Sequence, residues 1–564
     1  MITSDWLHPS LVLIAGTLVL PLLKGRAMQA WMVLLPLAVL GTLWMAQPGE
    51  HGQMAFLGME LVTGRVDELA MVFGWVFGTV LLIGAIYALH VNDRVQHVAA
   101  FLYGASALGV VFAGDLITLY VFWELMVITS VWLIWRRKTE VSFNAGFRYL
   151  VIHAVGGVVL LAGIILFQFE TGTTRFEQID VDGPAFWLIL AAFMINAAVP
   201  PLHAWLTDAY PEATVTGAVF LSALTTKTAV YTLIRGYPGT EMLVWMGAAM
   251  TLYGVTFAML SNDIRRLLAY HIVSQVGYMV TGVGLGTALA LSGSASHAFT
   301  HILYKALLFM GAGAVIHMTG RSRLSELGGL YRYMPWTFVL YLIGGVSISA
   351  FPLFSGYVSK TMIVEAAAID QRAVIWLMLV VASAGTFLST TLKLPYKTWL
   401  GGDSGLQPRE APWNMLLAMG IAAALCFLIG IFPGMLYALL PGAVDFNAYT
   451  MSVFLKEMQV LLFTGLAFCL LLKYVGGGPK ISLDVDWLYR RGGPRLVGAV
   501  GSAIITTDRA IRRTTLEHLA RLTAHVEKKH GRDGKLAKSW PIGSMALWTA
   551  IVLAMLLTFG VYRG

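Results

Sequence analysis

Five ionisable side chains lie within long apolar stretches of the sequence. They are Glu124 in DLITLYVFWELMVIT, Lys227 in FLSALTTKTAVYTLI, Lys305 in HAFTHILYKALLFMGAG, Lys360 in SAFPLFSGYVSKTMIVEA and Lys393 in STTLKLPYKTW. Burial disfavours a charged lysine and a nearby carboxylate favours it, so a change in the Glu–Lys distance would make the lysine release or capture a proton. The pattern indicates proton movement. A Glu–Lys pair that only bridges two helices, and a Lys393 that extends to the membrane surface, are the structural alternatives.

Two histidines, His297 and His301, precede Lys305 at steps of four residues. That spacing places all three side chains on one face of a helix. Histidine titrates near neutral pH, so His301 can pass a proton to the next site. Ligation of a metal or haem by these residues and His271 is the alternative, but no cysteine or carboxylate set at ligand spacing accompanies them. We therefore expect neither a metal nor a cofactor.

Two apolar segments carry helix-breaking residues. MINAAVPPLHAWLTDAYPEA contains Pro200 and Pro201, and GGVSISAFPLFSGYVSKTM contains Pro352 and Gly356. Proline removes a backbone donor, so each helix should open there and expose backbone that lines a polar cavity. Both breaks fall in the fourth span of successive five-span blocks, residues 96–235 and 241–400. Paired interrupted helices of this kind are typical of inverted-repeat transporters.

The composition defines the class of protein around these residues. Of 564 residues, 58% are hydrophobic and 12% charged, against about 45–50% apolar and about 25% charged in soluble domains. A soluble enzyme and a disordered chain are both excluded. The net charge of +8 does not indicate nucleic acid, because the basic residues lie between apolar runs. The two cysteines, Cys426 and Cys469, form no disulfide or metal pattern.

Apolar windows of membrane-spanning length recur along nearly the whole chain. At roughly 20 residues per span, they predict an all-α polytopic membrane protein of about 14–16 transmembrane helices. We expect N-terminal helices in residues 1–95, the two five-helix repeats in 96–235 and 241–400, and further helices in 412–474. A basic amphipathic segment, 475–540, and a final helix, 541–562, follow.

The distribution of lysine and arginine predicts the orientation. Loops on one side carry most of them, including Arg136, Arg137 and Lys138, and the opposite loops carry few. The predicted location is the bacterial inner membrane. The positive-inside rule then places the N-terminus outside the cell and the segment 475–540 in the cytoplasm. This segment is expected to lie on the bilayer or on a partner subunit. A solvated basic linker is the alternative.

Several motifs between about residues 60 and 435 make the chain recognisable. They are WELM, VPPLHAWLTDAYPEA, LTTKTAVYTLIR, NDIRRLLAYHIVSQVGYM, HAFTHILYKALLF and FPLFSGYVSK. The chain resembles the antiporter-like membrane subunits shared by respiratory complex I, membrane-bound hydrogenases and Mrp-type cation/proton antiporters, most closely the D-type Mrp subunits. The basic segment and final span, however, are similar to the lateral helix of the longest complex I subunit of this type, which the D-type Mrp subunits usually lack.

The resemblance implies a role for each charged residue. Glu124 matches a glutamate that modulates a neighbouring lysine, and Lys227 matches a lysine that bridges toward the middle of the subunit. His301 and Lys305 match a central relay. Lys360 matches the residue from which protons leave toward the outside.

Asn196 departs from the family pattern. The family usually carries a lysine five residues before the proline of PLH, and this chain has Asn196 there. Asparagine cannot titrate. Glu124 must then act on Lys227 or on water, or this half conducts differently or is structural.

The expected function is proton translocation by one subunit of a membrane complex, coupled to Na+ or another monovalent cation. Homologous antiporter-like subunits are the expected partners. A pumping subunit of a complex I-like or hydrogenase complex and a proton module for inorganic-carbon uptake are alternatives within the family. No motif for quinone, NADH or an iron–sulfur cluster is present, so in a redox complex the electrons would travel through other subunits. A haem or metal enzyme and a passive scaffold are alternatives of other classes.

Overall fold

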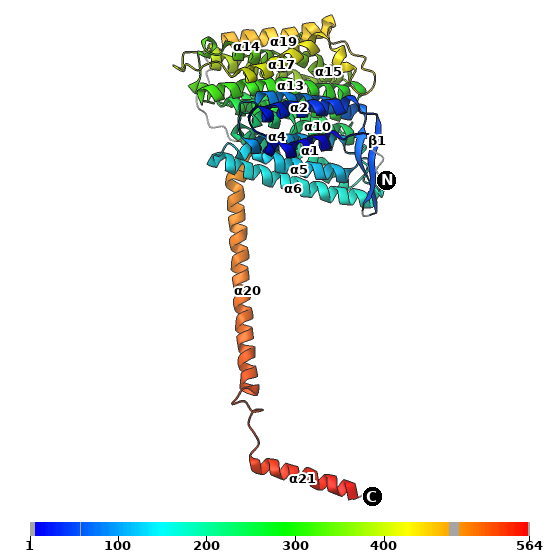
Figure 1. Ribbon diagram of the computed structural model, residues 1–564, viewed down its shortest axis with the longest axis vertical. Coiled ribbons are helices and arrows are strands. Elements are labelled where there is room, and N and C mark those ends of the chain that lie inside the picture. Colours follow the sequence, from blue (N-terminus) through cyan, green and yellow to red (C-terminus); the bar gives the residue numbers. More distant parts are fainter. Residues whose placement is uncertain (1–5, 57, 473–483, 562–564) are drawn as a thin grey trace. The chain divides into compact units, whose positions relative to one another are not determined.

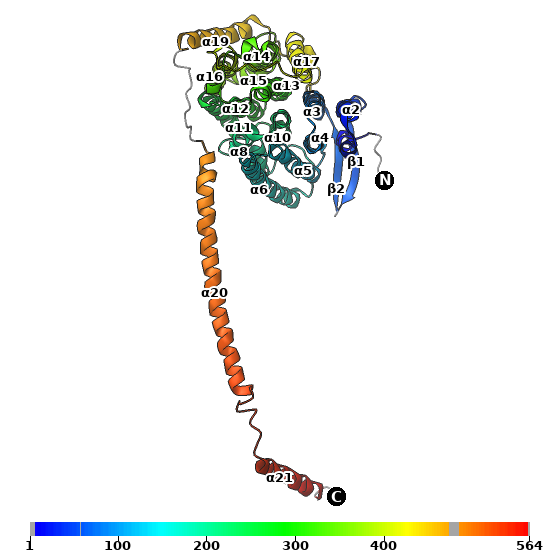
Figure 2. The ribbon, with the colours of Figure 1, turned by 60° about the vertical axis from the view of Figure 1, so that its left-hand side comes forward.

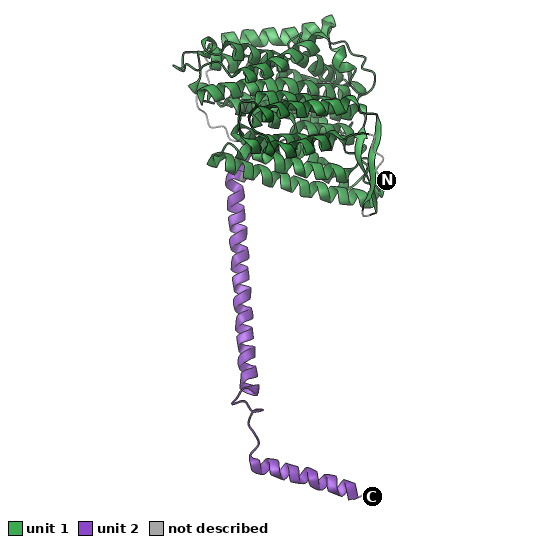
Figure 3. Cartoon of the chain, viewed as in Figure 1, with its two compact units in different colours: residues 1–484 green, residues 485–564 purple. Residues whose placement is uncertain are grey.

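The computed structural model describes residues 6–56, 58–472 and 484–561. The chain divides into two compact units, residues 1–484 and 485–564 (Figure 3). Parts of the predicted segments lie outside the described residues: 1–5, the single residue 57, 473–483 at the start of the basic segment, and 562 at the end of the final helix.

Helices lying side by side make up most of the first unit (Figures 1 and 2). In chain order they are α1 (Pro9–Val19), α2 (Gly25–Trp44), α3 (Glu68–Tyr87), α4 (Arg94–Phe112), α5 (Leu116–Trp135), α6 (Glu140–Thr171), α7 (Pro184–Asn196), α8 (Ala204–Ala209), α9 (Gly217–Ala223), α10 (Thr225–Gly236), α11 (Glu241–Leu260), α12 (Ile264–Leu285), α13 (Ala288–Thr319), α14 (Pro335–Ile348), α15 (Ser355–Ile369), α16 (Ala373–Thr386), the π-helix η5 (Phe387–Lys393), α17 (Trp413–Ile431), α18 (Gly434–Tyr437) and α19 (Met451–Leu470). Within the described residues, 12 helices are long and apolar enough to cross a membrane, and three shorter apolar helices accompany them. The predicted class, a helical polytopic membrane protein, is confirmed.

The two predicted helix breaks are present and share one backbone pattern. α7 ends at Asn196 and α14 ends at Ile348. Past each end, an alanine adopts the left-handed conformation, Ala198 at φ 57° and Ala350 at φ 57°. In each break the next amide turns back to bond a carbonyl inside the preceding helix, at 3.1 Å in both cases. This is the hydrogen-bond arrangement with which many helices terminate.

A similar correspondence extends through the two blocks. Asp115 caps α5 and Asp263 caps α12, each accepting two backbone N–H groups from the first turn of its own helix. Each aspartate forms an isolated antiparallel bridge, Asp115 with Arg175 and Asp263 with Arg323. The two aspartates are separated by the same number of residues as the two arginines. The two blocks therefore have the same order of these elements and the same local hydrogen bonds. An inverted relation between the blocks stays a prediction.

The chain also contains a β-hairpin that the sequence analysis did not predict. Strands β1 (Gly49–Phe56) and β2 (Met59–Val66) pair antiparallel. The Val62 carbonyl accepts from Gly114 N at 2.9 Å, and the Val62 amide donates to Asp115 Oδ2 at 2.8 Å. The hairpin adds a small two-stranded sheet to the helical fold. Its glycine-containing sequence lies between two apolar spans, and its stabilising contacts lie far along the chain.

The second unit contains two long helices, α20 (Gly493–His530) and α21 (Ile542–Val561). α20 falls within the segment predicted to be amphipathic and carries exposed apolar side chains, among them Ile504, Ile511 and Leu519. No residue of either helix is buried. α21 is long and apolar enough to span a membrane.

Glycine allows α11 and α12 to approach closely. A methyl group added at Gly254 of α11 would lie 2.5 Å from the Ser274 amide nitrogen of α12, and one at Gly277 would lie 2.6 Å from the Gly247 carbonyl oxygen. Small residues at such crossings bring helix backbones into contact in membranes.

We predict that Gly254→Ala destabilises the protein, because the added methyl group meets backbone that cannot rotate away. The expected loss is about 1–3 kcal/mol, measured as a lower unfolding temperature of the purified protein. Gly420→Ala, in α17, is the matched control, because a methyl group there meets nothing within 4 Å. Equal unfolding temperatures for the two variants would contradict this account of the α11–α12 contact.

Candidate functional site

Lys227 is completely buried beside an interruption between α9 and α10. Its ammonium donates to the Ser222 carbonyl at 2.5 Å and to Thr226 Oγ1 at 3.1 Å. Ser222 is the second-last residue of α9, where carbonyls lose their helical partners and carry the negative end of the helix dipole. A helix end rather than a carboxylate therefore holds this lysine.

Lys360 lies in the same kind of environment at the second predicted break. It is completely buried in α15, and its ammonium donates to the carbonyl of Ile348, the last residue of α14, at 2.7 Å. Ser383 Oγ lies 3.4 Å from the ammonium, and the Tyr278 ring centroid lies 5.3 Å from it. The break therefore supplies the carbonyl that binds the charged residue.

Lys393 also binds a helix end. Its ammonium donates to Met259 O at 2.5 Å and to Ser261 O at 3.1 Å, where α11 ends. Only 3% of the residue is exposed. Lys393 is therefore covered by protein, and the end of α11 supplies its hydrogen-bond acceptors. It caps α11.

α13 carries the predicted row of His297, His301 and Lys305, all completely buried. His297 contacts Ser359 Oγ at 3.0 Å through Nδ1 and Gln275 Oε1 at 3.1 Å through Nε2. Within the described part of the chain, neither nitrogen of His301 has a hydrogen-bond partner, and the Lys305 ammonium has none either.

His301 lies within electrostatic range of three buried lysines. It interacts with the charges of Lys227, Lys305 and Lys360, which come from α10, α13 and α15. α13 thus brings residues from both blocks of the chain together around one histidine.

Glu124 lies on α5, partly buried, with Oε1 lacking a partner among the described residues. Its carboxylate fills the space beside Gly157 of α6, where an added methyl group would come within 1.8 Å of Oε1. Glu124 and Lys227 form no ion pair in the described part of the chain. The sequence-based pairing of these two charges therefore stays a prediction.

Asn196, at the end of α7, is buried and accepts a hydrogen bond at Oδ1 from His153 Nδ1 of α6, at 2.8 Å. The Ile195 carbonyl beside it accepts from the Trp205 indole at 2.9 Å. At this first predicted break, the His153 imidazole and the Trp205 indole bond groups at the helix end. At the second predicted break and at the interruption between α9 and α10, a lysine bonds the helix end.

Two carboxylates near the site were not singled out from the sequence. Asp484 Oδ1 lies 3.3 Å from Nε2 of His203, a residue of the PLH motif, and its carboxylate accepts hydrogen bonds from Tyr253 and Tyr270. Burial alone would raise the pKa of Asp484, but the hydrogen bonds from these partners outweigh it and hold the pKa well below the usual aspartate range. A contact between residues so far apart in sequence leaves no local signal.

Glu457 is the second carboxylate. It is buried in α19 and interacts electrostatically with Lys360. In the sequence, Glu457 lies at the start of a predicted span, where charged residues are common, so it was not singled out. Its charge inside that span is the sequence feature that could have identified it.

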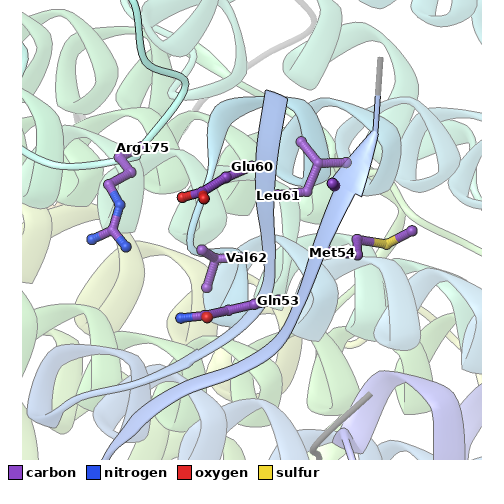
Figure 4. A pocket seen from close by; sticks show the side chains of 7 residues that line it. Gln53, Met54, Glu60, Leu61, Val62 and Arg175 are labelled. Carbon is purple, nitrogen blue, oxygen red and sulfur yellow. The ribbon is translucent and has the colours of Figure 1, made fainter. Parts of the chain in front are cut away.

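The described residues contain no group of three or more His, Cys, Asp or Glu placed to hold a metal ion. A small surface pocket of about 170 Å³ lies at the hairpin between β2 and Arg175 (Figure 4). None of the predicted site residues lines it. The candidate site is thus the buried row of charges and not a surface pocket.

Comparison with known proteins places the chain in a family. The family described as "NADH:quinone oxidoreductase/Mrp antiporter, TM" matches residues 113–389. An uncharacterized protein of Methanocaldococcus jannaschii is 30% identical over 420 residues, covering 68% of this chain and 86% of that protein. The D-type subunit of the Na+/H+ antiporter of Alkalihalophilus pseudofirmus is 29% identical over 365 residues, covering 61% of this chain and 74% of that protein.

Among solved structures, a chain of the membrane-bound sulfane sulfur reductase, an archaeal respiratory membrane complex, matches with a TM-score of 0.71 and 22% identity. The match covers 98% of this chain and 99% of that one. Relatives of this kind are parts of multisubunit membrane complexes. The chain belongs to the family of antiporter-like membrane subunits, and the resemblance drawn from its motifs is confirmed.

Proposed function

We propose that the chain translocates protons as one subunit of a membrane complex. The observation that carries the proposal is the buried row of bases on α13, His297, His301 and Lys305. This helix packs against both α10, which carries Lys227, and α15, which carries Lys360. Intramembrane ionisable residues are costly to bury and mark ion pathways. Five such groups around one helix are difficult to explain by packing alone.

The proton-transfer chemistry follows from how the lysines are held. A helix-end carbonyl stabilises the ammonium of Lys227 or Lys360, because each ammonium proton needs an acceptor. Lys305 has no such acceptor among the described residues, so its amine lacks the stabilising contact that the other two lysines make. Transfer then runs from Lys227 through the α13 row to Lys360. Each step changes the charge that the next group experiences.

The finer proposal is Mrp-type exchange of a monovalent cation, Na+ first, for protons in a bacterial inner membrane. The similarity to a subunit of a Na+/H+ antiporter supports it. In this proposal other antiporter-like subunits lie beside the chain, and the basic segment faces the cytoplasm. Backbone carbonyls freed at the helix breaks are suitable oxygen ligands for Na+.

A pumping subunit of a respiratory-type complex is the second candidate. Two observations favour it: the long helix α20 followed by the apolar helix α21, and a fold match over 98% of the chain to a subunit of a respiratory complex. Cation dependence separates the two candidates, because only the exchanger needs Na+ or K+ for proton flux.

Replacement of Lys227 tests the relay. We predict that Lys227→Ala abolishes proton flux in everted vesicles that contain the assembled complex, because it removes the buried lysine that precedes the α13 row. Assembly, judged by co-purification of the other subunits, should be unchanged. Lys24→Ala is the control, because Lys24 is an exposed lysine at the start of α2. Wild-type flux in Lys227→Ala would contradict the relay.

Two neighbouring glycines test the position of Glu124. We predict that Gly157→Ala lowers proton flux about tenfold, because a displaced charged group functions poorly and the new methyl group must move the Glu124 carboxylate. Gly156→Ala should retain flux, because its methyl group meets Ile195 at an ordinary 3.6 Å. Equal flux in the two variants would show that the position of Glu124 does not matter.

A further inference from the structure

His153 is a buried histidine that the relay described above does not use. It is completely buried in α6, its Nδ1 binds Asn196, and its Nε2 has no partner among the described residues. The rings of Tyr149 and Trp205 enclose it at centroid distances of 4.3 and 4.4 Å. A buried imidazole with one free nitrogen is unusual, because buried polar atoms are nearly always paired.

The contact with Asn196 determines which nitrogen is free. Asn196 presents Oδ1, an acceptor, to Nδ1 of the ring. A neutral imidazole that donates from Nδ1 carries its lone pair on Nε2. The free nitrogen is therefore the basic one, ready to take a proton.

The internal repeat gives His153 a counterpart. Gly172 and Gly320 end α6 and α13 in the left-handed conformation, and both helices have 32 residues. The separation of these glycines, applied to His153, leads to His301. It also leads from Gly157 to Lys305. His153 thus occupies in the first block the position of the histidine at the centre of the α13 row.

Glu124 contacts the helix that carries His153, at Gly157. Gly157, whose Cα faces the Glu124 carboxylate, is one helical turn after His153 on the same face of α6. The charge of Asp208, on α8, is compensated by Arg148 at 2.6 Å. Glu124 is therefore the acid positioned to supply His153.

Side chains with hydroxyl groups lie from Tyr149 to Thr226, the residue before Lys227. Tyr149 packs on the His153 ring, and its hydroxyl bonds Ser130 Oγ at 2.8 Å and lies near Thr225. Thr225 also bonds the Tyr103 hydroxyl at 2.6 Å. The next residue, Thr226, accepts a hydrogen bond from the Lys227 ammonium. Hydroxyl groups both donate and accept, so such a series can carry a proton.

From these contacts we infer that His153 is the proton-carrying residue of the first block, standing between Glu124 and Lys227 in place of a titratable group at Asn196. The proton on the Glu124 carboxyl passes to Nε2 of His153, giving an imidazolium and a carboxylate. The imidazolium then returns to neutral by releasing a proton through the hydroxyl series. This inference rests on the proposed proton translocation.

The first test replaces His153 by glutamine, which keeps a polar side chain but cannot carry a proton. Proton flux of the assembled complex in everted vesicles should fall about tenfold or more, in line with the loss of a proton-transfer group. The matched control is His97→Gln in α4, a buried histidine that bonds only the Val91 carbonyl in the described structure, at 2.8 Å. The control should retain wild-type flux.

The second test returns a base to the site from the other helix. Asn196→Lys in the His153→Gln background should restore flux and move its pH optimum to a more alkaline value, because an amine is a stronger base than an imidazole. Asn196→Gln in the same background should restore nothing. A purely structural role for His153 predicts no rescue by the lysine and no change in the pH profile.

The outcomes separate this inference from the proposed function. Wild-type flux in His153→Gln, together with loss of flux in Lys227→Ala, overturns the inference and leaves the relay intact. Absence of proton flux from the wild-type complex under every cation condition overturns the proposed function. Loss of flux in His153→Gln that Asn196→Lys fails to rescue, with assembly preserved, also contradicts a proton-carrying role.

Discussion

The structure depends on one recurring interaction, the binding of a buried lysine by the free carbonyls at a helix end. Lys227 binds the end of α9, Lys360 the end of α14 and Lys393 the end of α11. An ammonium group cannot be buried in a bilayer without acceptors, and an ordinary helix offers none, because its carbonyls are already bonded. Helix ends inside the protein provide these acceptors, because their last carbonyls have no partner within the helix.

The two predicted breaks share a defined backbone conformation and hydrogen-bond pattern. At Ala198 and Ala350 the backbone adopts the left-handed conformation, which is uncommon for residues other than glycine. The same pattern of hydrogen bonds closes both helix ends, so the strained residues are held by the backbone itself. The first break differs in the group at its helix end, because Asn196 binds His153 there. The two blocks thus share a pattern of helix ends, and one of these ends holds no lysine.

α13 connects the blocks. His301 interacts with lysines from α10, α13 and α15, while Lys305 lacks the helix-end carbonyl that the other lysines bind. The lysines around α13 are thus held in two different ways, and the proposed relay joins them.

Much of this could be predicted from the sequence, because membrane burial makes charge conspicuous. Lys227, Lys360 and the α13 row were identified by charge inside apolar windows, and prolines marked the breaks. The partners of the lysines could not be predicted. The interruption at Leu224 carries no proline or glycine, so nothing indicated that Lys227 would bind Ser222.

Long-range contacts were equally hidden. Asp484 reaches His203 across much of the chain, and the hairpin is held by residues beyond α4. Neither arrangement follows from local pattern, because sequence periodicity reports only neighbours on one element. His153 was not singled out from the sequence, because its contact with Asn196 is visible only in the structure.

The central claim is that protons cross through the buried lysines. The most direct test measures dissipation of a pH gradient in everted vesicles that contain the assembled complex, with Na+, K+ or neither added, for the wild type and Lys360→Ala. The account predicts rapid dissipation by the wild type and its loss in Lys360→Ala. Wild-type dissipation in an assembled Lys360→Ala complex would contradict it.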